Sequence, residues 1–295
     1  MDKSGTLSFR GFYMRRFLRL YPALLLFMLV FNGLIIAVGH KVALGSILAG
    51  LFYATNYHDV YVETLPYNVN HILWSLAVEE HFYLFFPVMV WLFRDRLTAI
   101  LPWLLGIVLA VLAWRFVVFG ACGESSGGYC GADRRIYYGT DTIVDCIMYG
   151  AITAIVLHYY RATLMRVVNL PVLFGSIACL FATLLIRDEL FRQTIRYSLQ
   201  SISVALLILN VLYGSWRFPA AVLSFAPLIW VGKLSYSLYL VHFGVMMVMA
   251  AFFHSAGVAY PALYAVASTI AASASYYGIE RPMLRLRRRF GSHAR

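Results

Sequence analysis

Long uncharged apolar runs constrain this chain more than any other feature of its sequence. Residues 234–279 contain no Asp, Glu, Lys or Arg, and about 20 apolar helical residues are enough to cross the roughly 30 Å hydrocarbon core of a bilayer. Over the whole chain, 62% of the residues are hydrophobic and 13% are charged, whereas soluble domains carry about 25% charged residues. We therefore expect an all-α, polytopic integral membrane bundle and not a water-soluble fold.

The apolar runs divide into about eight expected transmembrane helices and one shorter segment. The helices are expected near residues 17–38, 74–93, 98–119, 136–158, 168–186, 198–214, 234–253 and 258–278. Residues 43–57 are apolar but short, so we expect a re-entrant or interfacial piece there. Because the chain contains no repeat and no separate soluble stretch, we expect one membrane-embedded domain over residues 1–295.

The positions of the basic residues test this topology, because Lys and Arg accumulate in cytoplasmic loops. With eight spans and both termini in the cytoplasm, 17 basic residues lie inside, six lie outside and Arg115 lies within a span. A ninth span at 43–57 would put the basic N-terminal and C-terminal segments on opposite faces. Topology and contact with anionic membrane lipid explain the net charge of +11. Nucleic-acid binding is not expected, since the basic residues border spans and form no separate domain.

The four cysteines agree with this topology. Cys122 and Cys130 lie in a Gly- and Ser-rich loop that is expected outside, where an oxidising compartment allows a disulfide. Cys146 and Cys179 fall within expected spans, where we expect them to act as small apolar residues. Their spacing fits no metal site, so no metal is expected. A cleavable signal peptide is not expected either, because the first residues are polar and basic.

The densest group of ionisable residues inside an expected span lies within residues 70–83. Such groups cost about 2.5–3.5 kcal/mol each on insertion scales and usually mark a functional path. At helical spacing His71, Ser75 and Glu79 share one face, and Glu80 points about 100° away. We expect one glutamate to face a cavity and the other to pair with a neighbouring helix. The alternative is a buried hydrogen-bond network that only holds helices together.

A pair of carboxylates forms the second polar group. Asp141 and Asp145 are four residues apart and are expected on one helix face. Two such anions in a dry site repel each other unless a cation lies nearby. Arg115, in the preceding span, is the expected partner. A structural ion pair and a binding role both remain open from the sequence.

Two more polar groups are expected toward the cytoplasmic side. Ser235, Tyr239 and His242 repeat at i, i+4 and i+7 and therefore share a face. A lone histidine in an apolar helix is often a core residue, but the neighbouring hydroxyls favour function here. Arg16 and Arg19 precede the first span, and guanidinium forks suit phosphate recognition. Ordinary positive-inside anchoring explains most such runs.

Taken together, these strings resemble the acyltransferase-3 family of membrane acyltransferases, which includes O-acetyltransferases of bacterial surface glycans. The similarity runs from about residue 9 to 285 and is carried, in the family's order, by residues 12–22, 71–83, 138–150, 232–242 and 276–282. Residues 71–83 match most specifically. The chain departs from the family at His81, Ile143 and Gly244, where Gln, Arg and Pro are usual.

The resemblance implies transfer of an acyl group, commonly acetyl, from cytoplasmic acyl-CoA to a hydroxyl of a cell-surface carbohydrate at a bacterial inner membrane. It assigns catalysis to His71, Glu79 and Glu80. Arg16 and Arg19 would hold the CoA phosphates. The donor would also meet Ser235, Tyr239 and His242. The acceptor would meet Trp74, Ser75, Asp141 and Asp145.

The family has two further spans ahead of its arginine-rich string, with an Arg and a spaced His that is taken as catalytic. Neither span precedes that string here, so we expect a chain that is N-terminally truncated relative to the family. Such a chain would lack normal acyl transfer unless His71 or His242 substituted. Two other hypotheses stay open. A transporter of small solutes or lipid-linked sugars would also bury carboxylates and histidines, and a non-catalytic remnant could scaffold partner proteins.

Overall fold

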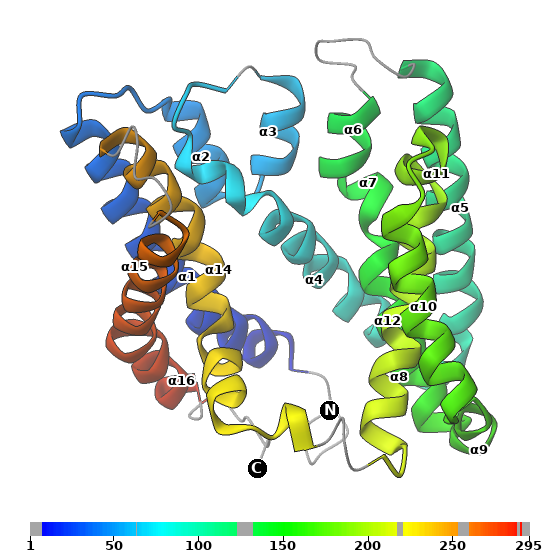
Figure 1. Cartoon of the computed structure of the whole chain (residues 1–295). Helices are drawn as coiled ribbons and strands as arrows, with labels where there is room; N and C mark the ends of the chain where they lie inside the picture. The colour runs from blue at the N-terminus through cyan, green and yellow to red at the C-terminus, as the bar shows by residue number, and fades with distance from the viewer. Residues whose placement is uncertain are drawn as a thin grey trace. The chain divides into compact units, whose positions relative to one another are not determined.

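The computed structural model describes residues 8–62, 64–122, 132–216, 221–252, 260–287 and 290. Every regular element within these ranges is helical and none is a strand, which confirms the expected all-α class (Figure 1). The chain divides into two compact units. Unit 1 comprises Met1–Thr55, Glu63–Leu73 and Ala226–Arg295, and unit 2 comprises Asn56–Val62 and Trp74–Phe225.

Unit 1 joins helices from both ends of the chain. Its elements are α1 (Phe9–Ala37), α2 (Leu44–Leu51), the 3₁₀ turn η1 (Val69–Leu73), α14 (Ala226–Phe252), α15 (Tyr260–Ser275), the π-helical turn η5 (Tyr276–Glu280) and α16 (Arg281–Arg287). Helix α1 packs against α14, η5 and α16, and α14 also packs against α15 and η1. A Cβ atom at Gly244 would lie 2.5 Å from the ring of Phe31, so glycine allows α14 to approach α1 closely.

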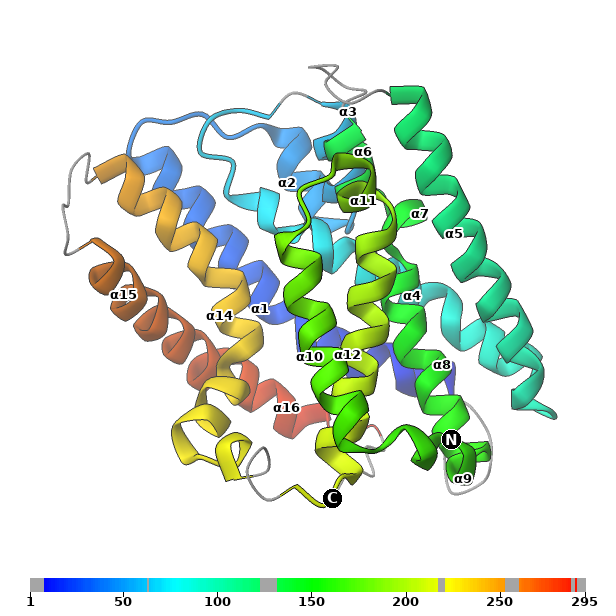
Figure 2. The ribbon, with the colours of Figure 1, turned by 45° about the vertical axis from the view of Figure 1, so that its right-hand side comes forward.

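Unit 2 holds the central part of the chain. After α3 (Thr55–Tyr61), whose first residue belongs to unit 1, its elements are α4 (Trp74–Leu92), η2 (Leu97–Ala99), α5 (Ile100–Cys122), α6 (Ala132–Tyr138), α7 (Thr140–Ile143), α8 (Asp145–Tyr159), α9 (Arg161–Leu164), η3 (Met165–Val167), α10 (Leu170–Leu185), α11 (Glu189–Gln193) and α12 (Ile195–Tyr213). Helix α12 packs between α10 and α8 (Figure 2).

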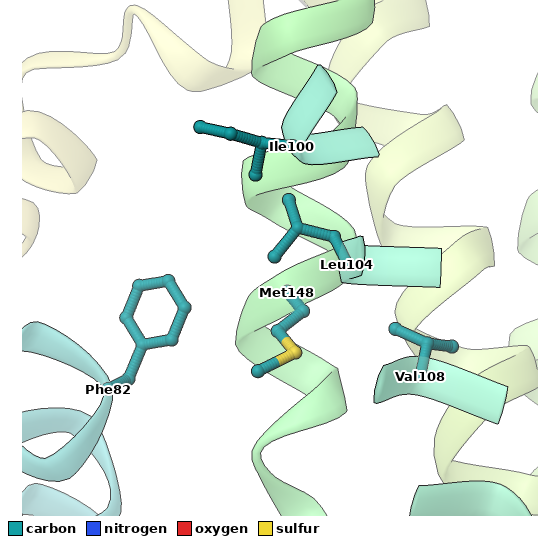
Figure 3. Packing of buried hydrophobic residues seen from close by; sticks show 5 residues of the cluster. All are labelled: Phe82, Ile100, Leu104, Val108 and Met148. Carbon is teal, nitrogen blue, oxygen red and sulfur yellow. The ribbon is translucent and has the colours of Figure 1, made fainter. Parts of the chain in front are cut away.

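A buried apolar cluster fixes the helices of unit 2 (Figure 3). Ile100, Leu104 and Val108 repeat every four residues along α5 and so share one face. Phe82 from α4 and Met148 from α8 complete the cluster. The polar residues of α4 and of the α7–α8 segment are therefore carried on a packed apolar frame.

Five helical segments are long and apolar enough to cross a membrane: Phe9–Ala37, Val69–Leu92, Leu97–Ala121, Ile195–Tyr213 and Ala226–Phe252. They match the first, second, third, sixth and seventh expected spans. The fifth expected span, 168–186, corresponds to α10, which forms a sixth apolar segment together with α9 and η3 across a bend of 67°. The described residues thus provide five or six spans, and the expected count of about eight is not confirmed.

The fourth expected span, 136–158, is broken in the structure, so the prediction of one helix there is wrong. Helix α6 ends at Tyr138, α7 covers only Thr140–Ile143, and α8 begins at Asp145. The Thr142 hydroxyl lies 2.8 Å from the carbonyl oxygens of both Ile136 and Gly139. It therefore solvates carbonyls that the break removes from a regular helical ladder.

The short apolar segment 43–57 forms two brief helices. Helix α2 ends at Leu51 and α3 begins at Thr55. Tyr53, between them, has a φ of 54°, a left-handed conformation that is uncommon for a residue with a side chain. An eight-residue helix such as α2 is too short to span a bilayer, as expected for this segment.

Candidate functional site

Asp141 is the centre of a half-exposed polar group in unit 2. Arg135 donates to both carboxylate oxygens, at 2.9 and 2.5 Å. Trp114 Nε1 and the Tyr57 hydroxyl donate to the same carboxylate at 2.7 and 3.1 Å. The hydrogen bond to Asp141 raises the pKa of Arg135, and burial, followed by the charge of Asp141, raises the pKa of Tyr57. This carboxylate orders aromatic and basic side chains around itself.

Asp145 lies in a separate and fully buried group. Its carboxylate meets the guanidinium of Arg115, and neither side chain is exposed. Arg115 also donates to the carbonyl oxygens of Thr142 at 2.6 Å and Thr194 at 2.7 Å. Ser198 Oγ donates to Asp145 at 3.3 Å. Arg115 therefore ties α5 to α7, α8 and the start of α12, and satisfies the carbonyl at the helix break.

The expected partnership of Arg115 with this pair of acids is thus confirmed for Asp145 only. Only Val144, itself in right-handed helical conformation, separates α7 from α8, so the expected i, i+4 spacing of Asp141 and Asp145 is not overturned. Each carboxylate has its own arginine, and the partner of Asp141 is Arg135. The sequence offered one signal for Arg135: it lies six residues before Asp141, in a segment expected outside the membrane.

Helix α4 is fastened to α7 through Thr140. The Thr140 hydroxyl oxygen lies 2.7 Å from Nδ1 of His81 and accepts a hydrogen bond from Nδ2 of Asn56 at 2.9 Å. The Trp74 ring packs against the rings of Tyr137 and Tyr138, with centroid distances of 4.7 and 5.1 Å. An aromatic cluster therefore stands at the start of α4.

The two adjacent glutamates of α4, Glu79 and Glu80, differ in solvent exposure. Glu79 is exposed, whereas Ser75 and Glu80 are half-buried. His71 lies in the 3₁₀ turn η1 and belongs to unit 1, where its ring is 5.9 Å from that of Phe243. The α-helical spacing that placed His71 on one face with Ser75 and Glu79 is therefore wrong, because a 3₁₀ turn advances by 3.0 residues per turn.

Helix α14 supplies a row of polar side chains in unit 1. The hydroxyl of Tyr236 donates to the carbonyl of Leu20 at 2.7 Å, and that of Tyr239 donates to the carbonyl of Ile72. His242 Nδ1 lies 3.0 Å from the carbonyl oxygen of Leu238. Since a carbonyl can only accept, Nδ1 carries the proton in the neutral imidazole and Nε2 holds a lone pair. His242 can therefore accept a proton at Nε2.

The buried serine of α14 is not the expected one. Ser235 is exposed, although it shares a helical face with Tyr239 and His242. Ser237 is buried and donates to Glu280 at 2.9 Å. Burial raises the pKa of Glu280, while the Ser237 hydrogen bond and the charge of Arg19 act in the opposite direction. Sequence reasoning missed Ser237, whose only signal was its place in the 232–242 string.

A buried amide network also escaped sequence reasoning. Asn32 and Asn70 exchange two side-chain hydrogen bonds, at 3.0 and 3.1 Å. Asn70 also donates to Ser46 Oγ at 3.2 Å, and Ser46 donates to Asn68 at 2.7 Å. The network fastens η1, which carries His71, to α1 and α2.

The arginine-rich start of α1 faces the chain's closing helix. Arg16 is half-buried and Arg19 is exposed. Arg15 Nη1 donates to the carbonyl of Phe290 at 2.7 Å. Among the residues that the structure describes, no group of three or more His, Cys, Asp or Glu side chains could hold a metal. Cys146 and Cys179 are free thiols, whereas the expected Cys122–Cys130 disulfide involves side chains outside the described residues.

A family model described as an acyltransferase domain matches residues 2–278 of the chain. The chain belongs to the acyltransferase-3 family. With its several apolar helices, this acyltransferase-3 chain is a multi-pass membrane protein. No solved structure matches it.

Two curated relatives of the acyltransferase-3 chain are named as O-acetyltransferases. One, "Putative O-acetyltransferase SACOL0978" of Staphylococcus aureus (strain COL), is 29% identical over 270 residues, which cover 83% of this chain and 42% of the relative. "Peptidoglycan O-acetyltransferase OatA" of Listeria monocytogenes is 29% identical over 271 residues, which cover 83% and 41% respectively. The chain thus spans less than half the length of these relatives.

Proposed function

We propose that this chain is a membrane O-acyltransferase that moves an acyl group, commonly acetyl, from acyl-CoA to a hydroxyl of a cell-surface carbohydrate. The family match over residues 2–278 carries the proposal. The names of both relatives favour acetyl as the acyl group, and the name of the Listeria relative favours a glycan as the acceptor. The proposed location is a bacterial inner membrane, with both termini in the cytoplasm where acyl-CoA is available.

The reaction replaces a thioester with an ester. The acceptor oxygen attacks the thioester carbonyl, a C–O bond forms and the C–S bond breaks. The proton of the acceptor hydroxyl passes through a base to the CoA sulfur, which leaves as a thiol. The protein must therefore hold the donor, hold the acceptor and supply a group that accepts a proton near neutral pH.

Residues of unit 1 are proposed to hold the donor. Arg16 and Arg19 would bind CoA phosphates through their guanidinium forks. Ser235, Tyr239 and His242 would line the path of the acyl chain and thioester. Two observations support this assignment: Tyr236 on α14 is bonded to the Leu20 carbonyl on α1, and α14 packs directly on α1. The arginines and His242 therefore stand on one packed framework.

A second group of residues is proposed to act on the acceptor. His71 would bind the acceptor or take its proton, and Glu79 and Glu80 would orient a catalytic imidazole. Trp74, Ser75 and Asp141 would contact the sugar. Aromatic rings stack on the C–H faces of sugars and carboxylates accept from their hydroxyls, so the cluster at Trp74 and the half-exposed Asp141 favour a carbohydrate. Asp145 is buried against Arg115, so its part would be to shape this region.

The test is label transfer by the full chain reconstituted in lipid nanodiscs. Radiolabelled acetyl-CoA and soluble peptidoglycan fragments are supplied, and label on the glycan is measured after separation. We expect transfer that is lost in His71→Ala and Glu79→Gln and retained in Arg94→Gln, an exposed arginine of unit 2 outside the proposed site. A folded protein that transfers no label contradicts the proposal. Uptake of a sugar into vesicles without acyl-CoA would instead identify a transporter.

A further inference from the structure

Three arginines lie on two helices of unit 1 that pack together. Arg15 and Arg19 are four residues apart on α1 and share a face. Arg287 ends α16, which packs against α1. Burial, followed by the charges of Arg19 and Arg15, lowers the pKa of Arg287. These three residues, far apart in the sequence, are here called the arginine cluster.

The described residues supply the arginine cluster with no close carboxylate partner. Within the described part of the chain, no carboxylate lies within 4.0 Å of these three guanidinium groups. Glu280 acts on Arg19 electrostatically, but its hydrogen bond comes from Ser237. Arg15 donates to a neutral backbone carbonyl, that of Phe290. Like charges held together in this way destabilise a fold unless an anion joins them.

Positive-inside anchoring does not account for this arrangement. Anchoring needs basic residues beside a span, and exposed arginines satisfy it. Arg285, on α16, is exposed and meets that description. Arg15 and Arg287 are instead half-buried and stand on two helices that pack together. Convergent guanidinium groups match the oxygens of phosphate, to which each can donate two parallel hydrogen bonds.

We propose that Arg15, Arg19 and Arg287 form one binding site for a phosphomonoester or pyrophosphate group, with Arg287 supplied by the closing helix α16. The proposal deepens the proposed function and rests on it for the natural ligand, since acyl-CoA carries both kinds of group on its nucleotide end. Anionic lipid headgroups carry the same chemistry. The site itself does not depend on turnover, so its existence can be tested by binding alone.

The first arm measures binding of CoA and of adenosine 3′,5′-bisphosphate to the full chain in nanodiscs of neutral phosphatidylcholine, by isothermal titration calorimetry. Arg287→Gln should weaken both by about tenfold, because it removes hydrogen bonds between a charged donor and the phosphate oxygens. The matched control on the same helix, Arg285→Gln, should change the dissociation constant by less than about twofold. Arg287→Lys keeps the charge without the fork and should fall between them.

The second arm measures lipid binding by native mass spectrometry of the same variants, with phosphatidic acid added. If phosphatidic acid is retained only when Arg287 is present, and nucleotide binding does not depend on Arg287, the site is supported and its phosphate comes from lipid. Nucleotide binding that requires Arg287 supports the nucleotide source. If neither ligand distinguishes Arg287→Gln and Arg287→Lys from Arg285→Gln, the proposal is overturned.

The two proposals fail separately. Binding that depends on Arg287 without any acetyl transfer would leave the anion site standing and reject the acyltransferase. Acetyl transfer with nucleotide affinity that is indifferent to Arg287 would do the reverse. Each variant is first checked for a single size-exclusion peak and a thermal unfolding midpoint close to that of the wild type. Arg287→Lys keeps the test decisive if Arg287→Gln does not fold.

Discussion

Arg115 in unit 2 and the arginine cluster in unit 1 differ in how their positive charges are compensated. The guanidinium of Arg115 is fully buried and meets a buried carboxylate and two backbone carbonyls. Arg15 and Arg287 are half-buried, and the described residues provide them with no carboxylate. Arg115, whose charge is neutralised by Asp145, holds helices together. The arginine cluster keeps its positive charge and is suited to bind an external anion.

The largest expected effect on stability comes from breaking the buried ion pair of Arg115 and Asp145. Arg115→Met leaves the Asp145 carboxylate buried without its partner, which should cost about 3–5 kcal/mol of stability. Thermal unfolding in detergent, followed by tryptophan fluorescence, measures this loss. The double variant Arg115→Met, Asp145→Leu should recover most of it, because two apolar side chains need no partners. A wild-type unfolding midpoint for Arg115→Met alone would show that the pair is not structural.

A smaller loss is expected from the buried amides of unit 1. Asn32→Ala leaves the Asn70 amide with unmade hydrogen bonds, at a cost of about 1–3 kcal/mol. The same unfolding measurement applies, and Asn32→Asp tests whether shape alone is enough. If Asn32→Ala and the double variant Asn32→Ala, Asn70→Ala were both as stable as the wild type, the amide network would not be needed to hold η1 in place.

A substitution in the arginine cluster should change ligand affinity and leave the stability of the fold nearly unchanged. Arg19→Gln should raise the KM for acetyl-CoA by about tenfold with kcat little changed, because it removes binding common to substrate and transition state. Steady-state acetyl transfer at varied acetyl-CoA measures both constants, with Arg94→Gln as the control. A fall in kcat at constant KM would place Arg19 in the chemical step and not in donor binding.

The smallest stability effect is expected at the half-exposed pair of unit 2. Asp141→Asn should cost no more than about 1 kcal/mol, since solvent reaches the pair. Its clearer signature is a lower pKa for Tyr57, because the Asp141 charge is one of the causes that raise it. Titration of ¹³C-labelled tyrosine by NMR, with Tyr57→Phe to identify the signal, measures this shift. An unchanged Tyr57 titration would contradict the hydrogen bond to Asp141.

The sequence was sufficient to predict the helical class, the positions of the long spans and one ion pair. Uncharged runs longer than a bilayer crossing allow few other structures, and Arg115 was the one cation inside a span. Asp145 is its partner. Such predictions succeed because burying an unpaired charge is costly enough to overrule local preferences.

The predictions that failed depended on an unbroken helical period. Residues 136–158 were expected to form one helix, but the backbone is extended at Gly139. Thr142 donates to the carbonyls of Ile136 and Gly139 at that break, and Arg115, from α5, donates to the carbonyl of Thr142. His71 was placed on α4, but it lies in a 3₁₀ turn. Tertiary hydrogen bonds decide these local geometries, and a single sequence carries no sign of them.

The π-helical turn at Tyr276–Glu280 sets the phase of everything that follows it. A π turn holds one residue more than an α turn, and each residue of an α-helix advances the rotation by about 100°. The extra residue is taken up within the turn, so α16 keeps the face that a regular helix one residue shorter would give it. A regular α-helix through all five residues would instead turn the face of α16 by about that angle, and Arg287 would leave α1 although no arginine had been altered. The π turn thus acts as an angular spacer whose length, as much as its chemistry, decides which residues meet.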